Sequence, residues 1–213
     1  MQPLFLDIET IARPGAEVLL EEPQAPANYK DAAKIEAYIA EAKAKQREKM
    51  ALDMDCCEIV TIGVAVDDPP AIAAAVGDGR YSCEGELLAA FWEYVDGMMN
   101  TLVIGYNIGE FDLPTLYWRS FLLGVTPSVP QEQWDYRPYQ KAPVLDMMQV
   151  LSRWGKKPYR SLKRTCQLCG IPEPTGDGAD VGAMSPEERI AHCKSDVEAT
   201  RNLYNKGRGY YWQ

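Results

Sequence analysis

Residues 4–10 read Leu-Phe-Leu-Asp-Ile-Glu-Thr, and this alternation of apolar and polar side chains predicts a β-strand close to the start of the chain. Because side chains on a strand alternate between its two faces, Asp7 and Glu9 must project from the same face, with Ile8 on the opposite one. Two neighbouring carboxylates repel each other, so they need either exposure to water on an edge strand or a divalent cation with oxygen ligands. This stretch by itself leaves both interpretations open.

The composition is that of an ordinary globular chain. Of its 213 residues 46% are hydrophobic and 25% are charged, which suits one domain with a substantial core. No apolar run approaches the roughly 20 residues needed to cross a bilayer, so we expect a cytoplasmic protein without a membrane partner. The net charge of −9 argues against unspecific coating of nucleic acid, but a nuclease needs only a local basic patch.

The six cysteines lack the spacing of a disulfide-rich scaffold, which favours a reducing compartment. Cys166 and Cys169 form a C-x-x-C pair that could be half of a zinc site. The pair lies in a predicted helix that ends at Gly170, and no second pair of Cys or His follows at a suitable spacing. The pattern therefore favours core packing over zinc binding.

The first half of the chain predicts a long surface helix and the start of a sheet. Residues 29–53 are rich in Ala, Lys and Glu and contain no Gly or Pro, and their sparse apolar positions predict a helix lying mostly on the surface. Its basic side chains could touch a phosphate backbone or simply face solvent. Residues 59–66 and 71–76 are β-branched or small, which predicts two neighbouring antiparallel strands beside the first one.

A second informative stretch runs from Leu102 to Leu116. A short apolar strand ends at Asn107, a turn containing glycine follows, and Pro114 suits the first turn of a helix. Asp112 therefore lies at a strand-to-helix corner, where α/β sheets often place functional groups. Asp112 could equally be no more than the N-cap of that helix.

The segment from Arg153 to Arg164 is basic although the chain as a whole is acidic. It contains no acidic residue, so it is the best candidate for phosphate contacts, and Trp154 and Tyr159 are available to stack on bases. A solvated helix end would explain the charges equally well. The basic residues are Arg153, Lys156, Lys157, Arg160, Lys163 and Arg164.

The clearest helix of the chain begins at Ser185, which combines with Pro186 and Glu188 in a capping-box pattern, and should continue to about residue 204. On this helix His192 and Asp196 lie one turn apart and can converge on a single point. The pair could be structural or functional, and His192 is the only histidine in the chain.

Taken in order, the motifs LFLDIET, GYNIGEFDLPTL and HCKSDVEAT resemble the three exonuclease motifs of the DEDD superfamily of 3′-5′ exonucleases. Most closely, the chain resembles stand-alone predicted exonucleases related to the proofreading domain of family B DNA polymerases, often found in bacteria and their phages. The resemblance implies a ribonuclease H-like α/β fold, a mixed β-sheet flanked by α-helices. It also implies a single exonuclease domain over residues 1–213, with a helical insertion at about 28–53.

The resemblance implies a metal site made by four carboxylates, those of Asp7, Glu9, Asp112 and Asp196. They would hold two divalent cations, Mg²⁺ or Mn²⁺. Two such ions roughly 4 Å apart can activate a water and stabilise the departing 3′ oxygen of a phosphodiester. Without cations the four carboxylates would repel each other, so we expect the site to be loose without metal and firm with it.

Position 192 departs from the pattern of the superfamily. Its tyrosine branch has a Tyr four residues before the last aspartate, and its histidine branch has a His five residues before. Here His192 stands four residues before Asp196. It could orient or deprotonate the attacking water as a catalytic residue, since imidazole titrates near neutrality, or it could be a weakened substitute.

The expected substrate is the 3′ end of single-stranded DNA, hydrolysed one nucleotide at a time. The expected contacts to it are Thr10, Asn107, Phe111, Lys156, Lys157 and Arg160. A role in DNA replication or repair would require a partner such as a DNA polymerase. Two alternatives stay open: an exoribonuclease of the same superfamily, and a non-catalytic module that binds nucleic acid or a polymerase.

Overall fold

The computed structural model describes residues 1–66, 69–98, 100–176 and 178–212. Within it the chain forms two compact units. Residues 1–9 and 59–213 form the first, which we call the sheet unit, and residues 10–58 form the second, which we call the helical unit.

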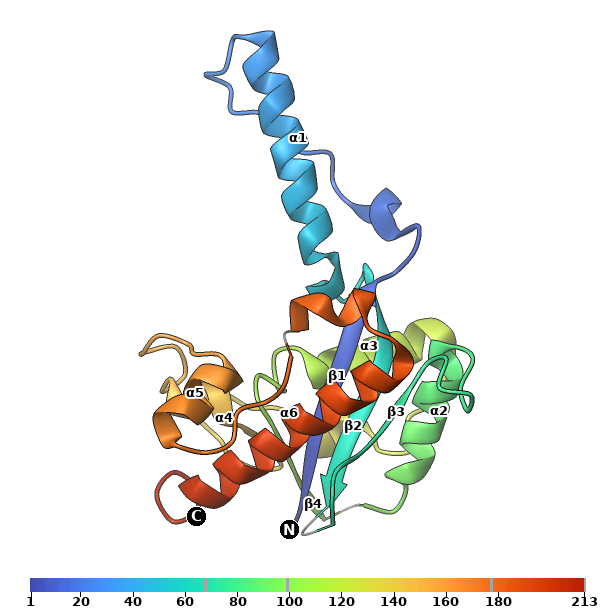
Figure 1. Ribbon diagram of the computed structural model, residues 1–213, viewed down its shortest axis with the longest axis vertical. Helices are drawn as coiled ribbons and strands as arrows, with labels where there is room; N and C mark the ends of the chain where they lie inside the picture. Colours follow the sequence, from blue (N-terminus) through green and yellow to red (C-terminus); the bar gives the residue numbers. More distant parts are fainter. Residues whose placement is uncertain (67–68, 99, 177, 213) are drawn as a thin grey trace. The chain divides into compact units, whose positions relative to one another are not determined.

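The sheet unit is built on a five-stranded sheet in the order β3-β2-β1-β4-β5 (Figure 1). Its strands are β1 (Gln2–Ala12), β2 (Cys57–Val66), β3 (Ile72–Ala75), β4 (Thr101–Gly105) and β5 (Val144–Asp146). The sheet is mixed, because β1, β4 and β5 are parallel whereas β2 and β3 form the predicted antiparallel pair. Since β1 lies between β2 and β4, the interpretation of Asp7 and Glu9 as exposed carboxylates on an edge strand is wrong.

One face of β1 carries Leu4, Leu6 and Ile8 into the larger hydrophobic core. Two helices, α2 (Glu84–Tyr94) and α3 (Asp112–Leu123), supply apolar side chains to the same core. Burial of these side chains removes apolar surface from water and fixes which way β1 faces. The carboxylates of the strand therefore have to project from its other face.

A buried ion pair holds these two helices to the sheet. Arg119 on α3 donates two hydrogen bonds to Glu84 on α2, at 2.9 Å from Nε and 2.6 Å from Nη2. The same carboxylate accepts the backbone N–H of Ile59 on β2 at 2.8 Å. A buried charge pair is tolerable when its remaining lone pairs are satisfied in this way.

The opposite face of the sheet is covered by α6 (Pro186–Gly207), drawn in red across the strands in Figure 1. Phe5 projects from β1 toward this helix and meets the ring of Tyr204 edge-on, with 5.5 Å between the ring centroids. The helix begins with the predicted capping box between Ser185 and Glu188. Because side chains alternate along β1, Asp7 and Glu9 share the face of Phe5 and lie under α6.

The remaining helices of the sheet unit are short. They are α4 (Met147–Leu151) and α5 (Leu162–Cys169), with the 3₁₀ turns η3 (Gln131–Trp134) and η4 (Gly178–Ala183). Helix α5 ends at Gly170 as predicted, and Cys166 is fully buried in it. Helices on both faces of a mixed sheet confirm the expected α/β fold.

The helical unit is dominated by α1 (Ala32–Lys49), preceded by η1 (Ala16–Leu19) and followed by η2 (Met50–Leu52). No residue of α1 is buried, in agreement with the sparse apolar positions of its sequence. The unit has a small core of its own, made by Ala16, Met50 and Cys56. None of the helices that the structure describes has the length and apolar character that spanning a bilayer requires.

The close packing of α6 on the sheet predicts the effect of one substitution. A Cβ atom added at Gly63 of β2 would lie 2.6 Å from Sγ of Cys193 and 3.1 Å from Cγ2 of Val197. We expect Gly63→Ala to lower the free energy of unfolding by about 1–3 kcal/mol, the usual cost of overpacking. Urea denaturation measures this free energy.

Gly85→Ala is the matched control, because a Cβ at Gly85 in the first turn of α2 meets nothing within 4 Å. We expect it to leave stability unchanged or raise it slightly. Equal stability of the two variants would contradict the packing described for α6.

Candidate metal centre

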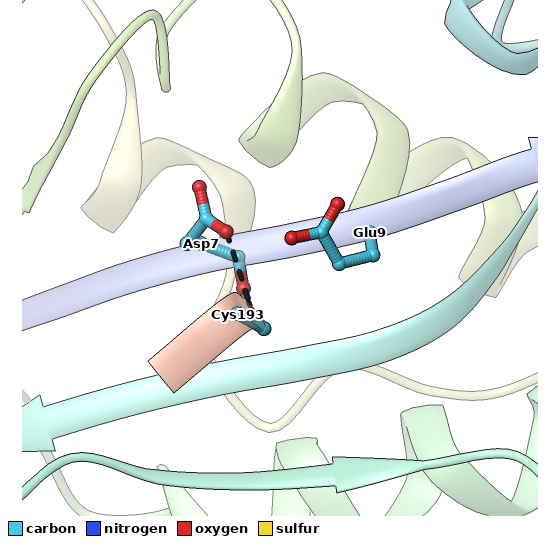
Figure 2. A group of neighbouring side chains, drawn as sticks. All are labelled: Asp7, Glu9 and Cys193. Atoms are coloured by element: carbon cyan, nitrogen blue, oxygen red, sulfur yellow. Dashed lines mark hydrogen bonds between the residues drawn. The ribbon is translucent and has the colours of Figure 1, made fainter. Parts of the chain in front are cut away.

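The centre is built on Asp7 and Glu9, which β1 presents side by side beneath α6. Figure 2 shows both carboxylates with the side chain of Cys193 next to Asp7. Glu9 is only 7% exposed, and ligand atoms of Asp7, Glu9 and Cys193 lie within 4.8 Å of one another. The two carboxylates therefore lie on the same face of β1, as the alternation of side chains along the strand predicted.

Asp112 reaches the same strand from the first turn of α3. Its Oδ1 accepts the backbone N–H of Ile8 at 3.1 Å, so the carboxylate is tied to β1 between Asp7 and Glu9. The alternative that Asp112 is only an N-cap is wrong, since Phe111 occupies that position and Asp112 begins the helix. The long-range bond to Ile8 places Asp112 at the site.

The turn before Asp112 is held by a residue to which the sequence assigned no role. Asp146 lies at the end of β5, almost fully buried, and accepts the backbone N–H groups of Asn107 at 3.2 Å and Gly109 at 3.1 Å. Asn107 adopts a left-handed φ of 73°, and its carbonyl accepts the N–H of Phe111. Asn107 and Phe111 thus shape the turn that carries Asp112.

His192 and Asp196 approach the strand from α6. Nε2 of His192 lies 3.5 Å from Oε1 of Glu9, and Nδ1 lies 3.9 Å from Oδ1 of Asp196. The Nδ1 atom also hydrogen-bonds the carbonyl oxygen of Thr175. The structure therefore brings both α6 residues to the carboxylates of β1, as their one-turn spacing predicted.

Cys193 is a neighbour of the centre that local sequence patterns did not indicate. Its thiol donates to Oδ2 of Asp7 at 3.5 Å and to the Asp7 carbonyl at 3.6 Å (Figure 2). Burial raises the pKa of this thiol well above its ordinary value, so it stays protonated near neutral pH. The two residues are 186 positions apart, and no local pattern could have paired them.

Burial and mutual repulsion make the carboxylates hard to ionise. Burial, followed by the charges of Asp196 and Asp112, raises the pKa of Glu9 to about 8. Burial also raises the pKa of Asp112 to about 7 and that of Asp196 to about 6. The pKa of Asp7 is raised well above its ordinary value by burial and by the charge of Glu9. Protons or cations must therefore compensate the cluster.

The donor set fits divalent cations. Two groups of three ligands share Glu9: Asp7 and Cys193 complete the first, and His192 and Asp196 complete the second. Within the described residues, Oδ1 of Asp196 is buried and accepts no hydrogen bond. A buried carboxylate oxygen without a donor is costly unless a cation satisfies it. Cys166 and Cys169 belong to neither group.

The expected substrate contacts are scattered. The hydroxyl of Thr10 donates to the carbonyl of Ala51 at 2.5 Å within the helical unit. Lys156, Lys157 and Arg160 are exposed in the loop between α4 and α5, whereas Lys163 and Arg164 are exposed in the first turn of α5. The carbonyl of Arg160 accepts the hydroxyl of Tyr106 at 2.7 Å, next to the turn that carries Asp112.

Tyr139 extends the basic loop and was not found from the sequence. Tyr139 is 64% exposed, and its ring centroid lies 5.1 Å from that of Trp154 and 5.7 Å from Nζ of Lys156. Tyr139, Arg153 and Trp154 have positive φ values of 68°, 54° and 53°. Such conformations cost energy in residues other than glycine and tend to be kept where a surface has a function. We call Tyr139, Trp154, Lys156, Lys157, Tyr159 and Arg160 the aromatic-basic surface.

The raised pKa values predict how the metal-free protein responds to pH. Each of these carboxyl groups has a higher pKa in the folded state than in the unfolded chain, so folding favours its protonated form. We expect the melting temperature of the chelator-treated protein to fall as pH rises from about 5 to about 9. Calorimetric melting across this range measures the effect.

Glu9→Gln is the matched variant, since it removes the carboxyl with a pKa of about 8 while keeping the shape of the side chain. In this variant the melting temperature should fall less at the alkaline end of the pH range than it does in the wild type. Mn²⁺ should raise the melting temperature of the wild type most above neutral pH. A wild-type melting temperature that rises with pH would contradict the electrostatics described above.

Comparison with known proteins gives one family and one fold. The family model described as a predicted 3′-5′ exonuclease related to the exonuclease domain of PolB matches residues 51–209. The match includes Asp112, His192 and Asp196 and begins after Asp7 and Glu9. No curated protein matches the chain at a significant level.

Among solved structures, the chain is similar to a family B DNA polymerase from the hyperthermophilic archaeon Pyrobaculum calidifontis. The TM-score is 0.61 at 17% identity, over 98% of this chain and 24% of the polymerase chain. At this identity the likeness shows the fold alone, and it bears out the expected ribonuclease H-like architecture. The chain spans about a quarter of the length of that polymerase.

Proposed function

Because the chain belongs to the family of predicted 3′-5′ exonucleases related to the exonuclease domain of PolB, we propose that it removes nucleotides from the 3′ end of single-stranded DNA. The observation that carries the proposal is the convergence of four carboxylates from β1, α3 and α6. Glu9 and Asp112 are buried, and Asp7 and Asp196 are half-buried. A cluster of four carboxylates with raised pKa values is well suited to bind divalent cations, which prefer oxygen ligands.

In this proposal Asp7, Glu9, Asp112 and Asp196 hold two divalent cations, Mg²⁺ or Mn²⁺. When bound there, the cations would activate a water for attack on the terminal phosphodiester and would stabilise the departing 3′ oxygen. The protein itself sets the positions of the ligands. Asp112 is fixed by the N–H of Ile8 at 3.1 Å, and Cys193 donates its thiol hydrogen to Asp7 at 3.5 Å.

His192 has two available roles at this site. It can accept a proton from the attacking water, or it can bind a cation directly. Both fit its position, with Nε2 at 3.5 Å from Oε1 of Glu9 and the ring buried beneath α6. In either role it acts on the same face of the sheet as Asp7 and Glu9.

The aromatic-basic surface supports a single-stranded substrate. Exposed aromatic rings can stack on unpaired bases, and the lysines beside them can neutralise phosphates. The surface is tied to the site, because the hydroxyl of Tyr106 bonds the carbonyl of Arg160 and Asn107 begins the turn that carries Asp112. A strand lying on this surface would pass next to the turn that carries Asp112.

The activity prediction uses a 5′-labelled single-stranded DNA oligonucleotide incubated with Mg²⁺, with Mn²⁺ and with chelator. We expect a ladder that shortens from the 3′ end with either metal and no cleavage with chelator. Asp7→Ala and Asp196→Ala should lower the rate by at least about a hundredfold, because loss of a ligand costs more than the outer-shell changes that cost about 10- to 100-fold. Glu93→Ala, an exposed carboxylate on α2, is the matched control and should keep the full rate.

Full activity of purified Asp7→Ala or Asp196→Ala would overturn the assignment of the site. A matching RNA strand in the same assay separates the exoribonuclease alternative, because it would be degraded faster than the DNA. Cleavage of neither strand with either metal would leave a nucleic-acid-binding module.

The binding prediction concerns the aromatic-basic surface. Stacking of a base on an aromatic ring is worth about 1–3 kcal/mol, so Tyr139→Ala should weaken binding of single-stranded DNA at least about fivefold. Fluorescence anisotropy in chelator, where the strand stays intact, measures this affinity. Tyr210→Ala is the control, since Tyr210 is 85% exposed and lies outside the surface. Equal affinities of these two variants would show that the strand binds elsewhere.

A further inference from the structure

We infer that His192 is itself a ligand of one of the two cations, bound through Nε2 together with Glu9 and Asp196. This inference rests on the proposed function and assigns His192 to binding rather than to proton transfer. His192 is 6% exposed and reaches Glu9 and Asp196 from α6. Ligand atoms of these three residues lie within 4.8 Å of one another.

A hydrogen bond to the backbone fixes the tautomer of the His192 ring. The carbonyl oxygen of Thr175 can only accept a hydrogen bond, so Nδ1 of His192 must carry the hydrogen that joins them. In the neutral imidazole this leaves the lone pair on Nε2. That lone pair lies 3.5 Å from Oε1 of Glu9, and two acceptors so placed need a cation or a proton between them.

The same hydrogen bond also fixes the orientation of the ring. Metal-bound histidines almost always donate their other ring N–H to a carboxylate, a carbonyl or a water, which fixes the tautomer and the orientation of the ring. Here the carbonyl of Thr175 takes that place. The N–H of Thr175 in turn donates to Oγ of Ser195 at 2.7 Å, so the carbonyl is anchored to α6 itself.

Gly176 packs closely against the ring of His192. It has a φ of 82°, and a Cβ added there would lie 2.9 Å from Nδ1 of His192. Only glycine lets the chain pass this close to the ring. The Thr175-Gly176 segment therefore keeps His192 turned so that Nε2 faces Glu9.

The carboxylate of Asp196, beside the ring, has an oxygen without a hydrogen-bond partner in the part of the chain that the structure describes. Within the described residues, Oδ1 of Asp196 is buried without a hydrogen-bond donor. A cation shared by Glu9, His192 and Asp196 would satisfy this oxygen and the Nε2 lone pair together.

A nitrogen ligand also has a consequence for metal choice. Mg²⁺ prefers oxygen ligands throughout, whereas Mn²⁺ accepts an imidazole more readily. We therefore expect the chain to bind Mn²⁺ more tightly than Mg²⁺, and His192→Gln to lower the affinity for Mn²⁺ at least about tenfold. The affinity for Mg²⁺ should change less, and calorimetric titration of both metals measures the difference.

The deciding experiment is electron spin echo envelope modulation on the Mn²⁺-loaded, tag-free protein. His192 is the only histidine of the chain, so modulation from a directly bound imidazole nitrogen can be assigned without any mutation. We expect ¹⁴N modulation that changes to the ¹⁵N pattern when the protein carries ¹⁵N-labelled histidine. The isotope control needs no variant and so does not depend on how a variant folds.

The outcomes separate this inference from the function on which it rests. Bound Mn²⁺ without modulation from the labelled nitrogen would overturn ligation by His192 and leave the proposed nuclease intact. Failure of the protein to bind Mn²⁺ at all would overturn the cation site and the proposed function with it.

Discussion

Repulsion among carboxylates gathered beneath α6 is the constraint on which the rest of the structure depends. Asp7 and Glu9 cannot turn away, because Leu4, Leu6 and Ile8 hold the other face of β1 in the hydrophobic core. Asp112 cannot retreat either, since its carboxylate accepts the N–H of Ile8. The burial energy of the core thus keeps together charges that would otherwise separate, and the raised pKa values are the result.

The residues around the centre are held in place by hydrogen bonds between buried polar side chains and the backbone. Asp146 accepts N–H groups of Asn107 and Gly109 and so fixes the turn before α3. The carbonyl of Thr175 holds the ring of His192 from behind. Each support takes a partner from a distant part of the chain, which makes the ligand positions a property of the whole fold. Ligands placed by such contacts are what a site for small, strongly charged cations requires.

Local sequence patterns predicted the elements and most of the centre. The alternation at Asp7 and Glu9, the corner at Asp112 and the helical spacing of His192 and Asp196 each depend on periodicities that short segments carry. The contact of Cys193 with Asp7, the role of Asp146 and the position of Tyr139 were missed because they depend on packing between remote segments. The central place of β1 is also set by strand order, so the edge-strand alternative could be rejected only with the fold in hand.

The most direct test of the central claim is the number of protons released when Mn²⁺ binds to the metal-free protein. With pKa values of about 8 for Glu9 and about 7 for Asp112, part of the cluster is protonated at neutral pH and must lose its protons to the cation. Calorimetric titration in buffers of different ionisation enthalpy measures this number. The account predicts net proton release that grows as pH falls from about 8 to about 6. Binding without proton release, or no binding, would contradict it.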